Sequence, residues 1–184
     1  MAITATQVKE LRQATGAGIM DCRRALQEHN GDYDKAVAWL REKGLAAAAK
    51  KAGREAKEGL VELYSHGGGR VGVMVEVNCE TDFVARTEQF RAFAHDLALQ
   101  VAAAHPRYLD VAEVPAAALA ADQESTGRDD PEKFYQEVCL LKQPFIKDES
   151  QTIADLLKAT IAAIGENVLI RRFARWELGE ALDQ

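Results

Sequence analysis

The chain has 184 residues, of which 47% are apolar, so it is long enough for one hydrophobic core with a small satellite domain. Its 29 Asp and Glu residues outnumber 23 Lys and Arg residues, and the net charge of -6 disfavours a broad positive surface for direct nucleic-acid binding. The sequence begins without a basic segment and apolar run, and no stretch reaches the roughly 18 apolar residues of a membrane span, so we expect a cytoplasmic protein without membrane contact.

Residues 1–44 are expected to form a small module of three helices. Apolar residues recur at spacings of three and four, which is typical of helices with one buried face. A Thr-Gly-Ala-Gly turn at residues 15–18 separates the first helix from the second. Asp32 is a candidate N-cap for the third helix, which we expect to end at Gly44.

Residues 45–57 are expected to form a basic, partly helical linker. The segment is rich in alanine and offers few large apolar side chains for packing. Its positive charges fit either a solvated face or a surface that contacts phosphate or a partner. These charges belong to Lys50, Lys51, Arg54 and Lys57.

Residues 58–184 are expected to form an α+β core that begins with a β-hairpin. Between Val71 and Cys79, apolar and other residues alternate, which predicts a strand with one buried face. A weaker strand covers Leu60–Tyr64, and the glycine-rich segment His66–Arg70 closes the hairpin. This segment lacks the Lys-Ser/Thr pair of a phosphate-binding loop and leads into a strand, so it predicts no phosphate site.

A long amphipathic helix follows the hairpin and ends before Pro106. Its apolar face predicts packing against the sheet through Phe90, Phe93, Ala94, Leu97 and Val101.

Residues 107–131 have an uneven, polar pattern that predicts a surface excursion. Asp130 and Pro131 have the pattern of an N-cap and a first-turn proline, so we expect a helix that runs through Leu141 and stops at Pro144.

The last predicted elements are a helix and a strand. Thr152 and Asp155 resemble a capping box at the start of an amphipathic helix that ends at Gly165. The β-branched and aromatic run Val168–Leu178 predicts a third strand beside the hairpin. The predicted fold class is therefore α+β, with a small helical bundle followed by an antiparallel sheet of about three strands and packed helices.

The cysteines are odd in number and far apart, and they form no Cys-x-x-Cys pair. Buried free thiols in a reducing cytoplasm are one interpretation, and a redox or metal role is the other. The residues are Cys22, Cys79 and Cys139.

No catalytic motif of the nucleophile-elbow, zinc-protease, phosphate-loop or dinucleotide type occurs in the sequence. The four histidines are scattered over predicted loops and helices without a shared face, and we interpret them as surface or packing residues. We therefore expect no catalytic residues, no metal, no cofactor and no enzymatic reaction.

Three stretches in the same order resemble the elongation factor Ts family. They are VKELRQATGAGIMDCRRAL near the start, VEVNCETDFVAR at residues 75–86, and VCLLKQPFIKDESQTIADLL with ENVLIRRFARWELGE in the C-terminal part. The resemblance implies a helical N-terminal module built like ubiquitin-associated domains. It also implies that the chain is a guanine-nucleotide exchange factor for the GTPase elongation factor Tu.

The resemblance assigns partner contacts to two places. The first is a tetrapeptide at the predicted strand-to-helix turn, residues 81–84. In the family, this tetrapeptide inserts near the partner's magnesium and disturbs the groups that hold the nucleotide phosphates. By the same resemblance, Ile19 and Met20 are candidate partner contacts, although packing inside the small bundle is an equal alternative for them. The tetrapeptide consists of Thr81, Asp82, Phe83 and Val84.

Read without the resemblance, the same tetrapeptide has a purely structural interpretation. Thr81 or Asp82 is then the N-cap of the following helix, and Phe83 is a hydrophobic staple. The two interpretations are compatible, because a rigid, capped turn is a good mount for an inserted side chain.

The chain has room for one hairpin-and-helix unit where longer family members carry a duplicated core. A three-stranded sheet has two edges and a narrow core, so we expect a homodimer that supplies the second unit and binds two copies of the GTPase.

Two other functions agree with parts of the sequence. One is a peptide-binding adaptor, in which a module like a ubiquitin-associated domain is attached to an unrelated α+β core. The other is an enzyme whose active site is dispersed along the chain.

Overall fold

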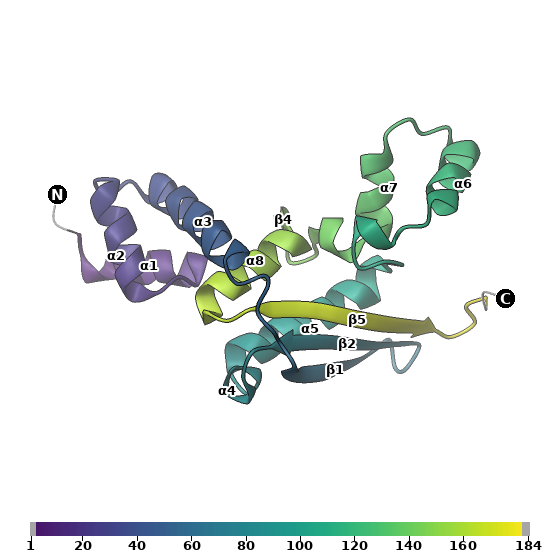
Figure 1. Cartoon of the computed structure of the whole chain (residues 1–184), viewed down its shortest axis with the longest axis horizontal. Helices are drawn as coiled ribbons and strands as arrows, with labels where there is room; N and C mark the ends of the chain where they lie inside the picture. Colours follow the sequence, from purple (N-terminus) through teal and green to yellow (C-terminus); the bar gives the residue numbers. More distant parts are fainter. Residues whose placement is uncertain (1–2, 182–184) are drawn as a thin grey trace.

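The computed structural model describes residues 3–181 and has an α+β architecture (Figure 1). A helical bundle at the N-terminus is followed by a sheet with helices packed on one side, and a further pair of helices projects from the core. The predicted fold class is confirmed.

The N-terminal bundle consists of α1 (Ala5–Thr15), α2 (Ile19–Glu28) and α3 (Tyr33–Ala49). Asp32 caps α3 as predicted, because its Oδ1 accepts a hydrogen bond from the backbone N of Lys35 at 3.1 Å. The three helices bury a small core of their own, formed by Val8, Leu11, Cys22, Ala25, Leu26, Ala36 and Leu40.

The predicted end of the third helix at Gly44 is wrong, since α3 continues to Ala49. The alanines after Gly44 favour helix, and the extended helix packs against α8 (Ile153–Ile164). The contact is close, because a Cβ added at Gly44 would lie 3.1 Å from the Cβ of Ala162. Ala48 joins the main core. The division into a module of residues 1–44 and a linker of residues 45–57 stays a prediction.

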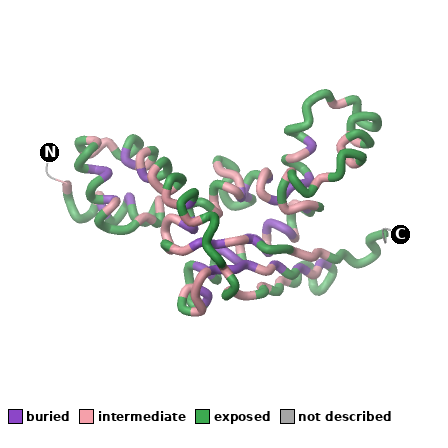
Figure 2. The backbone as a smooth tube through the Cα atoms, in the orientation of Figure 1, coloured by how far each residue is buried: buried purple, intermediate pink, exposed green. Residues whose placement is uncertain are grey.

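The central sheet is antiparallel, with the strand order β1 (Glu58–His66), β2 (Val71–Cys79) and β5 (Val168–Glu177). These are the three predicted strands, the first of them longer than expected. The inward residues of β2 are buried under α5 (Glu88–Ala104). Figure 2 shows the buried residues concentrated between the sheet and its helices. All five residues predicted for the apolar face of α5 are buried.

The opposite side of the sheet, which we call the outer sheet face, carries several exposed apolar side chains. Leu63, Met74 and Ala174 are direct cross-strand neighbours in register. The exposed large apolar residues are Val61 and Leu63 on β1, Met74 on β2 and Trp176 on β5. No helix covers this face within the described residues.

The excursion after α5 is more ordered than its sequence predicts. It contains the short helix η1 (Val111–Glu113), α6 (Ala116–Thr126) and α7 (Pro131–Val138). A third small core holds it together, in which Phe134, Val138 and Cys139 are buried.

The helix predicted to run through Leu141 ends earlier, at Val138. Asp130 caps it as predicted, with Oδ1 accepting from the backbone N of Glu132 at 3.0 Å. Cys139 leaves the helix because it forms a bridge with Tyr108, and the chain continues as the short helix η2 (Leu140–Lys142).

A two-stranded ribbon that the sequence did not predict precedes α8, formed by β3 (Pro144–Phe145) and β4 (Asp148–Thr152). The predicted capping box of Thr152 and Asp155 is present at the start of α8, and Gly165 ends this helix in a left-handed conformation.

All three cysteines are buried free thiols, as the first interpretation of them proposed. Among residues 3–181, no helix is long and apolar enough to cross a membrane.

Candidate partner-binding site

The predicted contact tetrapeptide lies directly after β2, where the chain turns into the single-turn helix α4 (Asp82–Ala85). Thr81 has extended backbone angles, and its Oγ1 accepts a hydrogen bond from the backbone N of Val84 at 3.4 Å. The N-cap is therefore Thr81, and Asp82 is the first residue of the helix.

The side chains of this turn point in different directions. Phe83 is 79% exposed, so the prediction that it acts as a hydrophobic staple is wrong. Asp82 forms an ion pair with Arg86, with Oδ2 and Nη2 2.7 Å apart. Val84 packs partly buried against the main core. The turn thus exposes an aromatic ring to solvent, beside a partly exposed carboxylate that is paired with Arg86.

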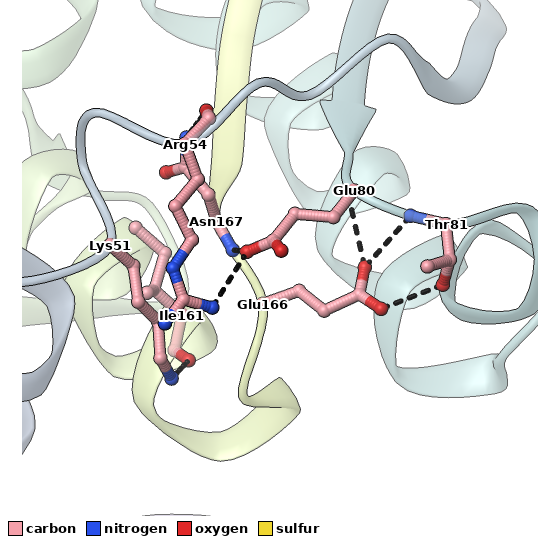
Figure 3. A network of polar contacts seen from close by, with 7 residues as sticks. All are labelled: Lys51, Arg54, Glu80, Thr81, Ile161, Glu166 and Asn167. Carbon is pink, nitrogen blue, oxygen red and sulfur yellow. Dashed lines mark hydrogen bonds and ion pairs between the residues drawn. The ribbon is translucent and has the colours of Figure 1, made fainter.

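A second segment, the loop between α8 and β5, holds this turn (Figure 3). The carboxylate of Glu166 accepts hydrogen bonds from the backbone N of Glu80 at 3.1 Å and of Thr81 at 3.0 Å, both through Oε2. Its Oε1 accepts from the hydroxyl of Thr81 at 2.6 Å. Both carboxylate oxygens of Glu166 are therefore used on two consecutive residues.

The neighbouring residue of that loop connects it to the segment after α3. Asn167 donates from its backbone N to Oε1 of Glu80 at 2.6 Å and from its side-chain amide to the carbonyl oxygen of Arg54 at 2.7 Å. The Glu80 carboxylate also lies 3.4 Å from a guanidinium nitrogen of Arg54. One of the four predicted linker charges thus has a structural partner close to the turn.

The carbonyl group of Thr81 is bound from the strand side. The thiol of Cys79 donates to this oxygen across 3.2 Å. Burial, followed by the charge of nearby Glu166, raises the pKa of the Cys79 thiol to about 11, so the thiol stays protonated and able to donate at neutral pH.

Sequence reasoning missed Glu80, Glu166 and Asn167, because their partners are remote in sequence. A signal existed in the predicted antiparallel pairing. Val168 starts β5 beside Cys79 at the end of β2, so the residue two positions before Val168 comes close to the residue two positions after Cys79.

The second pair of predicted contacts lies on the N-terminal bundle, at the start of α2. Ile19 is 57% exposed and Met20 is 68% exposed, so the alternative that they form the bundle core is wrong. Figure 1 shows α2 and α4 on separate parts of the molecule. The structure does not bring the two predicted contact regions together into one patch.

A family model described as elongation factor TS matches residues 5–129 and 126–180. The chain belongs to the elongation factor Ts family. This match includes both predicted contact regions and the loop that carries Glu166, and it confirms the resemblance found in the sequence.

Individual relatives support the same family over nearly their whole length. The elongation factor Ts of Carboxydothermus hydrogenoformans is 55% identical, with 98% of this chain and 91% of that protein covered. The elongation factor Ts of Caldanaerobacter subterraneus subsp. tengcongensis is 54% identical, with 99% of this chain and all of that protein covered. The alignments thus cover nearly all of both chains.

Proposed function

We propose that this protein is the guanine-nucleotide exchange factor of the GTPase elongation factor Tu and that it acts in translation elongation. The observation that carries the proposal is the family match over residues 5–180, which includes the exposed strand-to-helix turn. The partner is a cytoplasmic GTPase, so we place this protein in the cytoplasm. It needs no cofactor, because exchange changes binding equilibria and makes no covalent bond.

The turn at Thr81–Val84 is the proposed means of release. Phe83 reaches into solvent and is available to enter a partner, and the Asp82 side chain beside it is 46% exposed and paired with Arg86. Thr81 and Val84 hold the turn to the core. When the side chains of Phe83 and Asp82 displace the partner's magnesium, the partner binds GDP more weakly, because the ion is a large local charge between the phosphate oxygens.

Release follows from thermodynamic reciprocity. A factor that binds nucleotide-free elongation factor Tu more tightly than the GDP form must weaken GDP binding by the same ratio. The factor is therefore recovered after each exchange and acts in substoichiometric amounts.

Ile19 and Met20 are the proposed second contact. Two exposed large apolar side chains side by side at a helix N-terminus are suited to bury area against a partner. Both residues lie on the bundle, which we interpret as built like a ubiquitin-associated domain. They anchor the partner at a distance from the turn.

We also propose a homodimer that binds two copies of the GTPase. The support is the outer sheet face, whose apolar residues on all three strands are covered by no helix among residues 3–181. A second copy, related by a two-fold axis, would cover this face with its own.

The direct test is GDP release from elongation factor Tu loaded with a fluorescent GDP analogue. A substoichiometric amount of this protein should accelerate release, with no GTP hydrolysed by the protein alone. A release rate that is unchanged at every dose would contradict the proposal.

A further inference from the structure

Glu166 stands out because its carboxylate binds two consecutive residues of another segment, which lie 86 and 85 positions away in sequence. The bond to the Thr81 hydroxyl is short, at 2.6 Å, as expected where the acceptor is charged. Phe83, the exposed ring of the turn, follows two residues later.

Thr81 has a partner for each of its polar groups. Its backbone N and its hydroxyl donate to Glu166, and the hydroxyl oxygen also accepts from Val84. Its carbonyl oxygen accepts from the Cys79 thiol and from the backbone N of Ala85. A displacement of Thr81 therefore breaks several bonds at once, and Glu166 makes the charged ones.

The loop that carries Glu166 is itself fixed. Asn167 is 1% exposed and is bound to Glu80 and to the Arg54 carbonyl. On the other side, α8 packs against α3, and the ammonium of Lys51 reaches the carbonyl of Ile161 at 3.4 Å. The turn, the α8–β5 loop and the segment after α3 thus form one connected unit (Figure 3).

We propose that Glu166 is a positioning residue for nucleotide exchange, which holds the Thr81–Val84 turn so that Phe83 resists displacement when it meets the partner. The inference rests on the proposed function. A side chain can displace the groups around the partner's magnesium only if the turn that carries it is stiffer than those groups. Hydrogen bonds to a charged acceptor supply that stiffness.

The position of Glu166 separates this role from general stability. The residue is half-buried beyond the end of the sheet at which β2 ends and β5 begins, outside the apolar clusters that form the three cores. Glu166→Ala therefore leaves the cores intact and releases the turn, whereas Glu166→Gln keeps a carbonyl acceptor for the two amides but loses the charge.

The test compares wild type, Glu166→Ala, Glu166→Gln and the control Glu124→Ala, which removes an exposed carboxylate of α6. GDP release from elongation factor Tu is measured over a range of factor concentrations, to separate the saturating rate from the half-saturating concentration. Amide hydrogen exchange at residues 80–85 is measured on each chain without the partner, and thermal unfolding checks the fold.

We expect Glu166→Ala to lower the saturating rate about tenfold or more, with a change of less than about threefold in the half-saturating concentration. The amides of Glu80 and Thr81 should exchange faster, Glu166→Gln should fall between wild type and Glu166→Ala, and Glu124→Ala should match wild type.

The inference would be overturned by a saturating rate for Glu166→Ala equal to wild type, or by unchanged protection of the Thr81 amide. A loss of the whole thermal transition in both Glu166 variants would also overturn it, by showing a general structural role. If wild type itself fails to accelerate release, the proposed function fails, and amide exchange still decides whether Glu166 holds the turn.

Discussion

At the scale of single residues, neighbouring side chains of the turn after β2 face different surroundings. Thr81 and Val84 face the protein, whereas Phe83 places most of its ring in water. An aromatic side chain that stays exposed in the folded protein contributes no burial energy to the stability of the fold. This separation makes it possible to test the proposed role of Phe83 in exchange without a loss of the fold.

Phe83→Ala should lower the exchange rate strongly while it changes the free energy of unfolding by less than about 0.5 kcal/mol, as surface substitutions do. The matched control is Phe93→Ala, the same change at a ring that is 4% exposed in the core, which should cost about 3–5 kcal/mol. Exchange kinetics and denaturant unfolding check the pair. Exchange by Phe83→Ala at the wild-type rate would leave the turn a purely structural element.

Asp82→Ala should also reduce exchange while it has little effect on stability. Its pair with Arg86 is exposed, and such pairs contribute about 0–1 kcal/mol. The measurements are the same GDP-release assay and unfolding curves. The control is Asp155→Ala, which removes the carboxylate that accepts from the backbone N and the hydroxyl of Thr152 in a capping box, and it should lower stability while it leaves exchange unchanged.

The buried thiol beside the turn predicts a pH dependence of stability. The Cys79 thiol ionises near pH 9 in the unfolded chain and near pH 11 in the fold, so the fold favours its protonated form. This stabilisation is fully present below pH 9 and is lost as the pH rises towards 11. The stability difference between wild type and Cys79→Ala should therefore decrease from pH 8.5 to pH 10.5 in denaturant unfolding. A difference that stays constant over this range would contradict the assignment.

At the scale of elements, the hairpin of β1 and β2 depends on a close approach of two backbones. Gly59 has a φ of +141°, and a Cβ at this position would collide with the carbonyl oxygen of Val77 and lie 2.8 Å from the Cα of Asn78. The neighbouring strand leaves no space for any side chain, and a left-handed backbone adds strain. The sheet that carries the turn is thus sensitive to one glycine.

Gly59→Ala should lower the free energy of unfolding by about 2 kcal/mol or more, because both the strained backbone and the collision act against the fold. Gly53→Ala is the matched control: it lies in the segment after α3 with open space around the added Cβ, and it should change stability by less than about 0.5 kcal/mol. Equal unfolding curves for the two variants would show that the strand pair can separate at little cost.

At the scale of the whole molecule, the bundle and the core are distinct in packing but joined along α3. The bundle buries its own residues, whereas Ala48 at the end of α3 belongs to the main core. A cleft of about 420 Å³, lined by residues of both parts such as Asp21, Lys43 and Lys158, lies between them. The contact between the bundle and the core is therefore incomplete, because a cleft separates part of their surfaces.

A chain that starts at residue 50 should keep its sheet but lose stability, since it exposes the face of α8 that α3 covers, and it should bind elongation factor Tu poorly. The matched comparison is a chain that starts at residue 57, which also loses Lys51 and Arg54 and with them one hydrogen bond to Ile161 of α8 and one to Asn167. Circular dichroism and unfolding curves measure both chains. Complete unfolding of the first chain would show that bundle and core fold as one unit.

The homodimer should appear in light scattering at micromolar concentration as a mass of two chains. Leu63→Glu places a charge among the apolar residues of the outer sheet face, on the edge strand β1, and should yield single chains. Ile146→Glu, at an exposed apolar residue between β3 and β4, should leave the dimer intact. A mass of one chain for wild type at every concentration, with and without the partner, would refute the dimer.

Much of the architecture was readable from local pattern. Alternation along Val71–Cys79, the capping box at Thr152 and the N-caps at Asp32 and Asp130 each predicted the element found, because caps and periodicity are properties of a few adjacent residues. The errors have tertiary causes. Helix α3 passes Gly44 because α8 covers it there, and α7 stops at Val138 because Cys139 pairs with Tyr108.

Contiguous motifs were sufficient to predict the fold class, the family and the position of Thr81–Val84 at a capped strand-to-helix turn. No local pattern predicted that Phe83 faces solvent, that Ile19 and Met20 lie outside the bundle core, or that Glu166 binds the turn. The reason is that exposure and long-range hydrogen bonds depend on which remote segments meet. Here the start of β5 lies beside the end of β2, which brings residue 166 to residues 80 and 81.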